Sequence, residues 1–113
     1  MDAEAIGDLF QDLGAVRIRR MFGGYGIYFG DFIFALAIDG EIYLKTDVEN
    51  RSAFEEAGSR AFIYEKDGRP ISLGYWLLPD SALDDPAEAA RWAGLALAAS
   101  RRAAVRKRPR RKS

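Results

Sequence analysis

The sequence contains no cysteine and no histidine in its 113 residues. It can therefore form no disulfide framework, no thiolate nucleophile and no zinc site of the Cys/His type, and it offers no imidazole base or haem ligand. Only carboxylates, lysines, hydroxyls and tyrosines remain for chemistry. These absences lead us to expect neither a cofactor nor a bound metal.

Long hydrophobic runs and secretion signals are also missing. The longest apolar run, residues 32–38, has the length of a strand, and the opening residues are acidic where a signal peptide is positively charged. Since 49% of the residues are hydrophobic and 12% are aromatic, the chain can bury a core. We expect a cytoplasmic protein of one domain with a short extension and no membrane contact.

The balance of 17 basic against 17 acidic residues hides a strong asymmetry. Residues 101–113 hold eight basic groups and no acidic group, so residues 1–100 have a net charge of −8. The sequence therefore predicts an acidic domain over residues 1–103, followed by a disordered basic tail over residues 104–113.

Hydrophobic periodicity indicates three helices and six strands. A helical pattern covers about residues 3–13, and Asp85-Pro86 starts a long alanine-rich helix. Thr46 and Glu49 match a capping box, which predicts a short helix ending near Ala57. Alternation predicts strands over about residues 16–22, 25–29, 32–38, 42–44, 62–64 and 71–77.

The element order is therefore α-β-β-β-β-α-β-β-α, which indicates an α+β fold with helices packed on an antiparallel sheet in two layers. Asp39-Gly40 and Asp67-Gly68 are signals for tight hairpins. The strand over residues 32–38 is apolar on both faces and should be central, with Phe34 and Leu36 on one face and Ala35 on the other.

A glycine cluster follows the first strand, in the stretch Met21, Phe22, Gly23, Gly24, Tyr25 and Gly26. It looks like a fragment of a dinucleotide fingerprint, but that fingerprint needs a helix after the glycines. Because an alternating aromatic strand follows instead, we favour a tight hairpin whose backbone angles only glycine tolerates.

No arrangement of residues indicates catalysis. Glu55 and Glu56 are adjacent on a helix and point in different directions, while Asp85 is explained as a helix cap. The serines have no base to activate them, and no Ser-x-x-Lys sequence occurs. We therefore predict that the protein is not an enzyme.

The predicted sheet is rich in aromatic residues, which can stack on single-stranded bases. Sheets of that kind carry basic residues between the aromatics, whereas this domain is acidic, so we favour core and interface roles. The basic tail has two open interpretations: it contacts nucleic acid phosphates, or it is a solvated chain end. Its cations are Arg106, Lys107, Arg108, Arg110, Arg111 and Lys112.

Several of these stretches together resemble the N-terminal domain of the TfoX/Sxy competence regulators. The resemblance rests on residues 20–28, 34–36, 42–47 and 62–64, on Tyr75-Trp76-x-Leu78-Pro79, and on the segment that starts at Asp84. It covers about residues 5–103 and implies a two-layer α+β domain related to secretion-chaperone-like folds. It implies no catalytic residue.

The full regulators have a second, helical domain where this sequence has the basic tail, so their co-activation of transcription is not carried over. Two hypotheses remain. The first is a regulatory or adaptor module, monomeric or homodimeric, that binds a protein such as a transcription regulator. The second is a small protein that binds nucleic acid through the tail. The candidate interaction residues are Arg20, Met21, Phe22, Gly23, Gly24, Tyr25, Gly26, Lys45, Tyr75 and Trp76.

Overall fold

The computed structural model describes residues 1–21 and 23–107 of the chain. Its element order matches the predicted one, with a short 3-10 helix, η1, added before the last helix. The elements are α1 (Ala3–Leu9), β1 (Arg17–Met21), β2 (Gly24–Phe29), β3 (Phe32–Ile38), β4 (Glu41–Lys45), α2 (Arg51–Glu56), β5 (Ala61–Lys66), β6 (Arg69–Leu77), η1 (Asp80–Ala82) and α3 (Pro86–Lys107).

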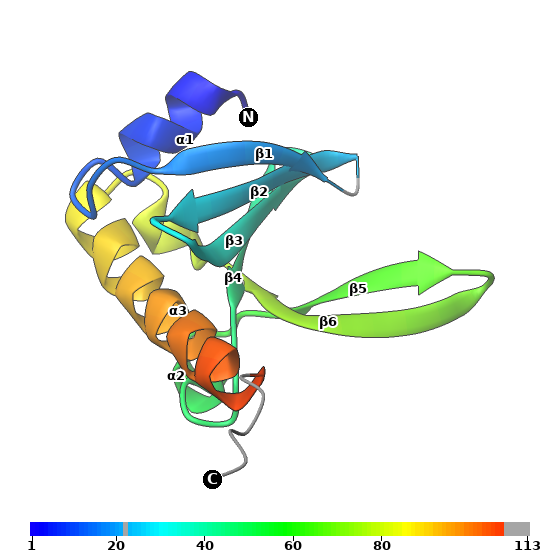
Figure 1. Ribbon diagram of the computed structural model, residues 1–113. Coiled ribbons are helices and arrows are strands. Elements are labelled where there is room, and N and C mark those ends of the chain that lie inside the picture. The colour runs from blue at the N-terminus through cyan, green and yellow to red at the C-terminus, as the bar shows by residue number, and fades with distance from the viewer. Residues whose placement is uncertain (22, 108–113) are drawn as a thin grey trace, which may run out of the picture.

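The strands form one antiparallel sheet in the order β1-β2-β3-β4-β6-β5. The predicted hairpin turns are present, with positive φ at Asp39 and Gly40 and again at Asp67 and Gly68, as type I′ turns require. β3 lies in the interior of the sheet, as predicted. The β5–β6 hairpin extends away from the body of the molecule (Figure 1).

Helices α1 and α3 lie on the same side of the sheet and enclose the main core (Figure 1). Phe10, the C-cap residue of α1, meets Phe34 of β3 edge to face, with ring centroids 5.2 Å apart. The inner side of α3 consists largely of buried alanines, among them Ala93 and Ala96, and such small side chains let the helix approach the sheet closely. No helix within residues 1–21 and 23–107 is long and apolar enough to cross a membrane.

A β-bulge in β3 changes the predicted distribution of side chains between the two faces. Ile27 pairs with Ala35 and Tyr28 with Ile33, so Phe34 is the extra residue. A bulge places two successive side chains on one face, and Phe34 and Ala35 both lie in the main core. The prediction that Phe34 and Leu36 share a face was therefore wrong, because Leu36 is buried outside that core.

The predicted capping box was also wrong. α2 begins at Arg51, and Asp47 rather than Thr46 accepts hydrogen bonds from the backbone N–H groups of Glu49 and Asn50, at 3.0 and 3.1 Å. The Thr46 hydroxyl donates instead to the carbonyl of Gly74, at 3.0 Å. A tertiary hydrogen bond to β6 has replaced the local one.

The last helix begins as predicted and extends into the predicted tail. Asp85 Oδ1 accepts hydrogen bonds from the N–H groups of Ala87 and Glu88, at 3.1 and 3.2 Å, which is the N-cap expected from the sequence. α3 then runs to Lys107, so the predicted domain boundary after residue 103 falls inside a helix. Tail residues 108–113 lie outside the described residues.

Candidate interaction face

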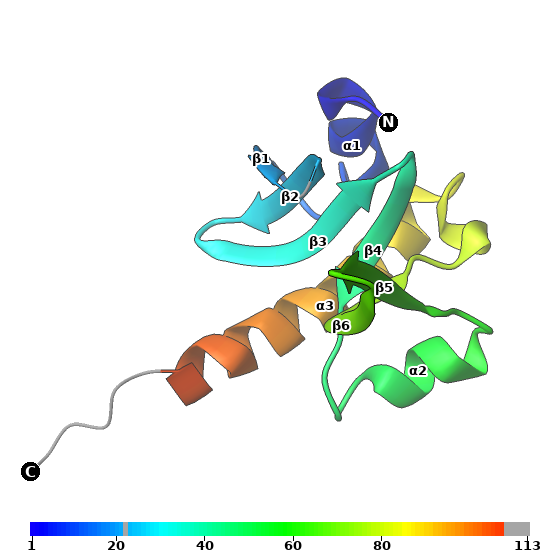
Figure 2. The same cartoon turned by 90° about the vertical axis from the view of Figure 1, so that its right-hand side faces the viewer.

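One face of the sheet is left uncovered by the described helices. Figure 2 looks onto this face, and no helix crosses in front of β2, β3 or β4. Residues paired across antiparallel strands point to the same side, so the strand register assigns its members. We call this surface the open face; the pairing also places Ile38, Glu41 and Leu77 on this side, and its other members include Arg17, Arg19, Met21, Tyr28, Ile33, Leu36, Tyr43, Lys45, Phe62 and Tyr75.

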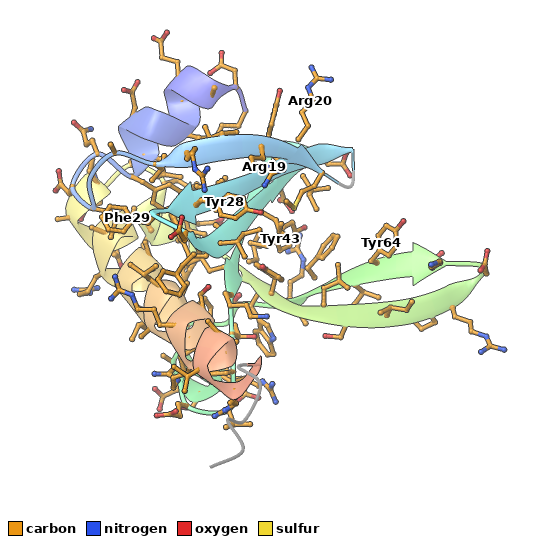
Figure 3. The ribbon with its side chains drawn as sticks, viewed as in Figure 1. Arg19, Arg20, Tyr28, Phe29, Tyr43 and Tyr64 are labelled. Carbon is orange, nitrogen blue, oxygen red and sulfur yellow. The ribbon has the colours of Figure 1, made fainter. Side chains whose placement is uncertain are left out.

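The centre of the open face is a small apolar cluster separate from the main core. Leu36 is 1% exposed and Tyr75 is 7% exposed, although no helix covers them. The ring of Tyr43 packs on that of Phe62 with centroids 4.8 Å apart. Figure 3 shows Tyr43 and Tyr64 directed into the space between the β1–β2 and β5–β6 hairpins.

Burial changes the acidity of two of these tyrosines. It raises the pKa of Tyr75 to about 12, with a smaller contribution from nearby Tyr28. Burial also raises the pKa of Tyr43, whose hydroxyl donates a hydrogen bond to Glu41 Oε2 at 3.0 Å. Both phenols are therefore neutral at physiological pH.

Cations flank the aromatic rings. The Arg17 guanidinium lies 5.3 Å from the ring centroid of Tyr28, and the Lys45 ammonium lies 5.1 Å from that of Tyr75. Arg19 is also exposed, and it lies on β1 between Arg17 and the β1–β2 turn. The open face thus has a local positive character on an acidic domain.

A charged network fixes the chain just after Lys45. Asp47 accepts hydrogen bonds from Arg102 of α3 at 2.6 and 3.0 Å, and Arg102 also pairs with Glu49 at 2.9 Å. The Arg102 hydrogen bonds hold the pKa of Asp47 below its ordinary value. Buried Asn50 donates to the carbonyls of Lys45 and Leu95, at 3.2 and 3.1 Å, and so joins β4 to α3.

Gly23 lies in the β1–β2 turn, whereas Gly24 and Gly26 lie in β2, and a structural constraint explains each of these three glycines. Gly23 has a φ of +73°, the left-handed conformation that the sequence predicted for this turn. A Cβ on Gly24 would lie 2.1 Å from the carbonyl oxygen of Ala37, and one on Gly26 would meet the side chains of Met21 and Ile33. A pocket of about 460 Å³ lies beside the turn, lined by Arg20, Met21, Gly23, Gly24 and Tyr25.

The candidate residues from the sequence are divided between the two faces. Met21, Gly26, Lys45 and Tyr75 come together on the open face. Tyr25 and Trp76 pack against the main core on the helix side, and Arg20, paired with Tyr25, points away from the open face (Figure 3). Phe22 lies outside the described residues.

The tail candidates are described only in part. Arg106 is exposed on the last turn of α3, which ends at Lys107. Arg108, Arg110, Arg111 and Lys112 lie outside the described residues. No group of three or more acidic side chains within residues 1–21 and 23–107 lies close enough to hold a metal ion.

Arg17, Arg19 and Tyr28 were not selected from the sequence. The alternation after Val16 places Arg17 and Arg19 opposite the apolar residues of β1, and this was the available signal. This alternation alone does not indicate a binding surface, because the pairing that brings Tyr28 and Lys45 to the same side depends on contacts between distant strands.

Comparison with known proteins assigns this fold to a family. The family model of the TfoX N-terminal domain matches residues 8–100. The chain belongs to the TfoX N-terminal domain family. The match begins within α1 and ends within α3, so it includes every strand of the sheet.

Two curated relatives of this TfoX N-terminal domain protein show the same similarity. Protein Sxy of Escherichia coli (strain K12) is 30% identical over 69 residues, which are 61% of this chain and 33% of that protein. The DNA transformation protein TfoX1 of Aliivibrio fischeri (strain ATCC 700601 / ES114) is 32% identical over 73 residues, 65% of this chain and 35% of that protein. The matched region is about a third of the length of each relative.

Proposed function

We propose that this protein is a non-enzymatic regulatory module that acts in the cytoplasm by binding a protein partner, such as a transcription regulator. The role it serves is regulation related to DNA uptake, since one relative is named as a DNA transformation protein. The partner binds on the open face.

The observation that carries this proposal is the composition of the open face. Half-exposed apolar side chains, those of Ile33, Tyr43 and Phe62, surround the buried Leu36 and Tyr75 on a sheet face without a helix, and the cations Arg17 and Lys45 flank them. Protein interfaces combine such an apolar centre with a polar rim, and tyrosine and arginine are enriched in them. Gly24 and Asp85, which could suggest ligand binding or catalysis in the sequence, have structural roles.

The experiment replaces open-face residues in the cells from which the chain comes and measures transcript levels. Lys45→Glu and Phe62→Ser alter this face, and their matched controls, Arg51→Glu on α2 and Val48→Ser in the loop before it, change exposed residues elsewhere. We expect both open-face variants to change the regulated transcripts as strongly as deletion of the gene, while both controls leave them unchanged.

Thermal melting of the four purified variants shows whether each remains folded. A folded Lys45→Glu variant with wild-type transcripts would contradict the proposal, and so would an equal effect of the controls.

A second candidate function is non-specific binding of nucleic acid by the C-terminal end, and the end of α3 favours it. Arg101 and Arg106 are exposed there, and the sequence continues with five more basic residues between positions 107 and 112. Arg102, by contrast, is held by Asp47 and Glu49. Phosphate contacts by such cations release counterions, so binding of this kind weakens steeply with salt.

A further inference from the structure

β1 is an edge strand with one free side. It pairs with β2 alone, and residues 17–21 make no other backbone hydrogen bond within the described part of the chain. Half of the hydrogen-bonding groups of this backbone are therefore open to an added strand. The side chains of β1 on the open face, Arg17, Arg19 and Met21, would lie next to that strand.

The charge of β1 is unusual for this domain. Three of its five residues are arginines, Arg17, Arg19 and Arg20, on a body whose first hundred residues have a net charge of −8. None of the ion pairs within residues 1–21 and 23–107 includes any of the three. The edge thus concentrates cations without a carboxylate partner.

These arginines determine which strand the edge accepts. If β1 of a second copy paired antiparallel about Arg19, Arg19 would face Arg19, and like charges directly opposite one another destabilise a sheet. A strand with carboxylates at those positions gains charge-assisted hydrogen bonds instead. Charge complementarity therefore excludes self-pairing about this residue and favours an acidic strand.

We propose that β1 receives an extended acidic segment of the partner protein as an added antiparallel strand. This inference rests on the proposed function and specifies the chemistry of its partner. The register of β1 defines the segment: an apolar residue opposite Met21, acidic residues opposite Arg20 and Arg19, an apolar residue opposite Ile18 and an acidic residue opposite Arg17. The acidic residues opposite Arg17 and Arg19 lie on the open-face side.

The test uses a fluorescein-labelled synthetic peptide with the core Val-Glu-Glu-Val-Glu between threonines, titrated with the full chain and followed by fluorescence anisotropy. A control peptide of equal charge has proline in place of both valines, since proline cannot continue a strand ladder. A short oligothymidylate is the nucleic acid probe. The protein variant is Arg17→Glu/Arg19→Glu, and Arg51→Glu/Arg91→Glu on the helices is its charge-matched control.

We expect the valine peptide to bind the wild-type chain and the control variant equally. Arg17→Glu/Arg19→Glu should weaken this binding by at least about tenfold, or about 1.4 kcal/mol, and the proline peptide should bind as weakly. Amide chemical shifts on peptide addition should change most at residues 17–21.

Four results would overturn the inference. Equal binding of the proline peptide would mean attraction by charge without strand addition, and equal binding to both double variants would place the site elsewhere. Tighter binding of oligothymidylate, in competition with the peptide, would make this edge a nucleic acid site. If no peptide binds, the arginines of β1 serve only to prevent this exposed edge from pairing with other strands.

Failure of this inference and failure of the proposed function can be told apart. If Lys45→Glu changes the transcripts but the peptide does not bind β1, the regulatory role is supported and the proposal of an added acidic strand is contradicted. If the peptide binds as expected but neither open-face variant changes the transcripts, the proposed regulatory role is contradicted.

Discussion

Gly24 lies where the backbone of β2 passes close to β3. A Cβ at this position would be 2.1 Å from the Ala37 carbonyl oxygen, which is backbone and cannot rotate away. We predict that Gly24→Ala lowers the free energy of unfolding by about 1–3 kcal/mol, because the two strands must move apart. Urea denaturation measures this loss.

Gly23 gives the matched control for Gly24. It has a φ of +73°, and no atom lies within 4 Å of the position that a Cβ would take, so only its backbone conformation is constrained. Asparagine tolerates that conformation, and Gly23→Asn should retain nearly all of the stability. Wild-type stability of Gly24→Ala would contradict the close approach of Gly24 to Ala37. If either glycine variant stays folded but loses partner binding, this turn is a recognition site.

Tyr75 predicts a specific response to alkaline pH. Its folded-state pKa of about 12 exceeds the ordinary 10.0, so the folded protein holds the phenol proton more tightly than the unfolded chain. The stability that this provides is complete below pH 10 and is lost as the pH rises to about 12. Tyr75→Phe should remove this part of the alkaline destabilisation, as thermal melts across that range would show. Parallel curves for wild type and variant would contradict the buried phenol.

At the level of elements, the ion pair between Asp47 and Arg102 joins the loop after β4 to α3. The pKa of Asp47 is lowered, first by its hydrogen bonds from Arg102, so the pair stabilises the fold above the ordinary carboxyl pKa of 3.8. Asp47→Asn keeps an acceptor for the backbone N–H groups but removes the charge. We predict a loss of about 1–3 kcal/mol at neutral pH.

This loss should diminish as the pH falls below 3.8 through the lower folded-state pKa, because the wild-type carboxyl then also becomes neutral. Urea denaturation at several pH values measures it. Glu49→Gln is the control, since Glu49 is 56% exposed and its pairing should contribute less than about 1 kcal/mol. A loss that stays constant with pH would contradict the role assigned to the charge.

Local signals in the sequence predicted the elements well. Asp39-Gly40, Asp67-Gly68 and Asp85-Pro86 each act within a few residues, and each produced the expected turn or cap. Thr46 failed because its hydroxyl bonds to Gly74, 28 residues further along the chain. The bulge at Phe34 depends likewise on pairing with β2, which short-range patterns do not record.

The open face was less predictable than the elements for the same reason. Lys45 and Tyr75 were both selected from the sequence, but only the pairing of β4 with β6 places them together. Arg17 and Tyr28 meet through the pairing of β1 with β2. The acidic charge of the whole domain obscured the local cations of this face, because a total does not show where charges lie.

On the scale of the whole molecule, exposed charge is uneven along α3. Acidic residues predominate at the end formed by α1, η1 and the start of α3, with Asp2, Glu4, Asp8, Asp80 and Glu88, while the exposed cations Arg101 and Arg106 lie toward the other end (Figure 1). A molecule polarised in this way should approach a polyanion with its C-terminal end first.

The second candidate function therefore makes a prediction about salt. If the six cations of residues 104–113 each contact a phosphate, the affinity for duplex DNA should fall with salt at a log–log slope of about −5. Deletion of residues 108–113 keeps α3 whole and removes four of these cations, so the slope should fall to about −2. Fluorescence anisotropy at several salt concentrations measures both slopes. Equal slopes for the full and shortened chains would place DNA binding outside the tail.

Binding of the partner on the open face is the central element of the proposed function. Photo-crosslinking in intact cells tests it directly, with a photoreactive phenylalanine analogue in place of Tyr43 on this face or of Leu83, which is 45% exposed near η1. We predict that the analogue at Tyr43 forms one defined adduct with a protein partner, that Arg17→Glu/Arg19→Glu abolishes it, and that the analogue at Leu83 forms none. An adduct at Leu83 alone, or none at Tyr43, would contradict the account.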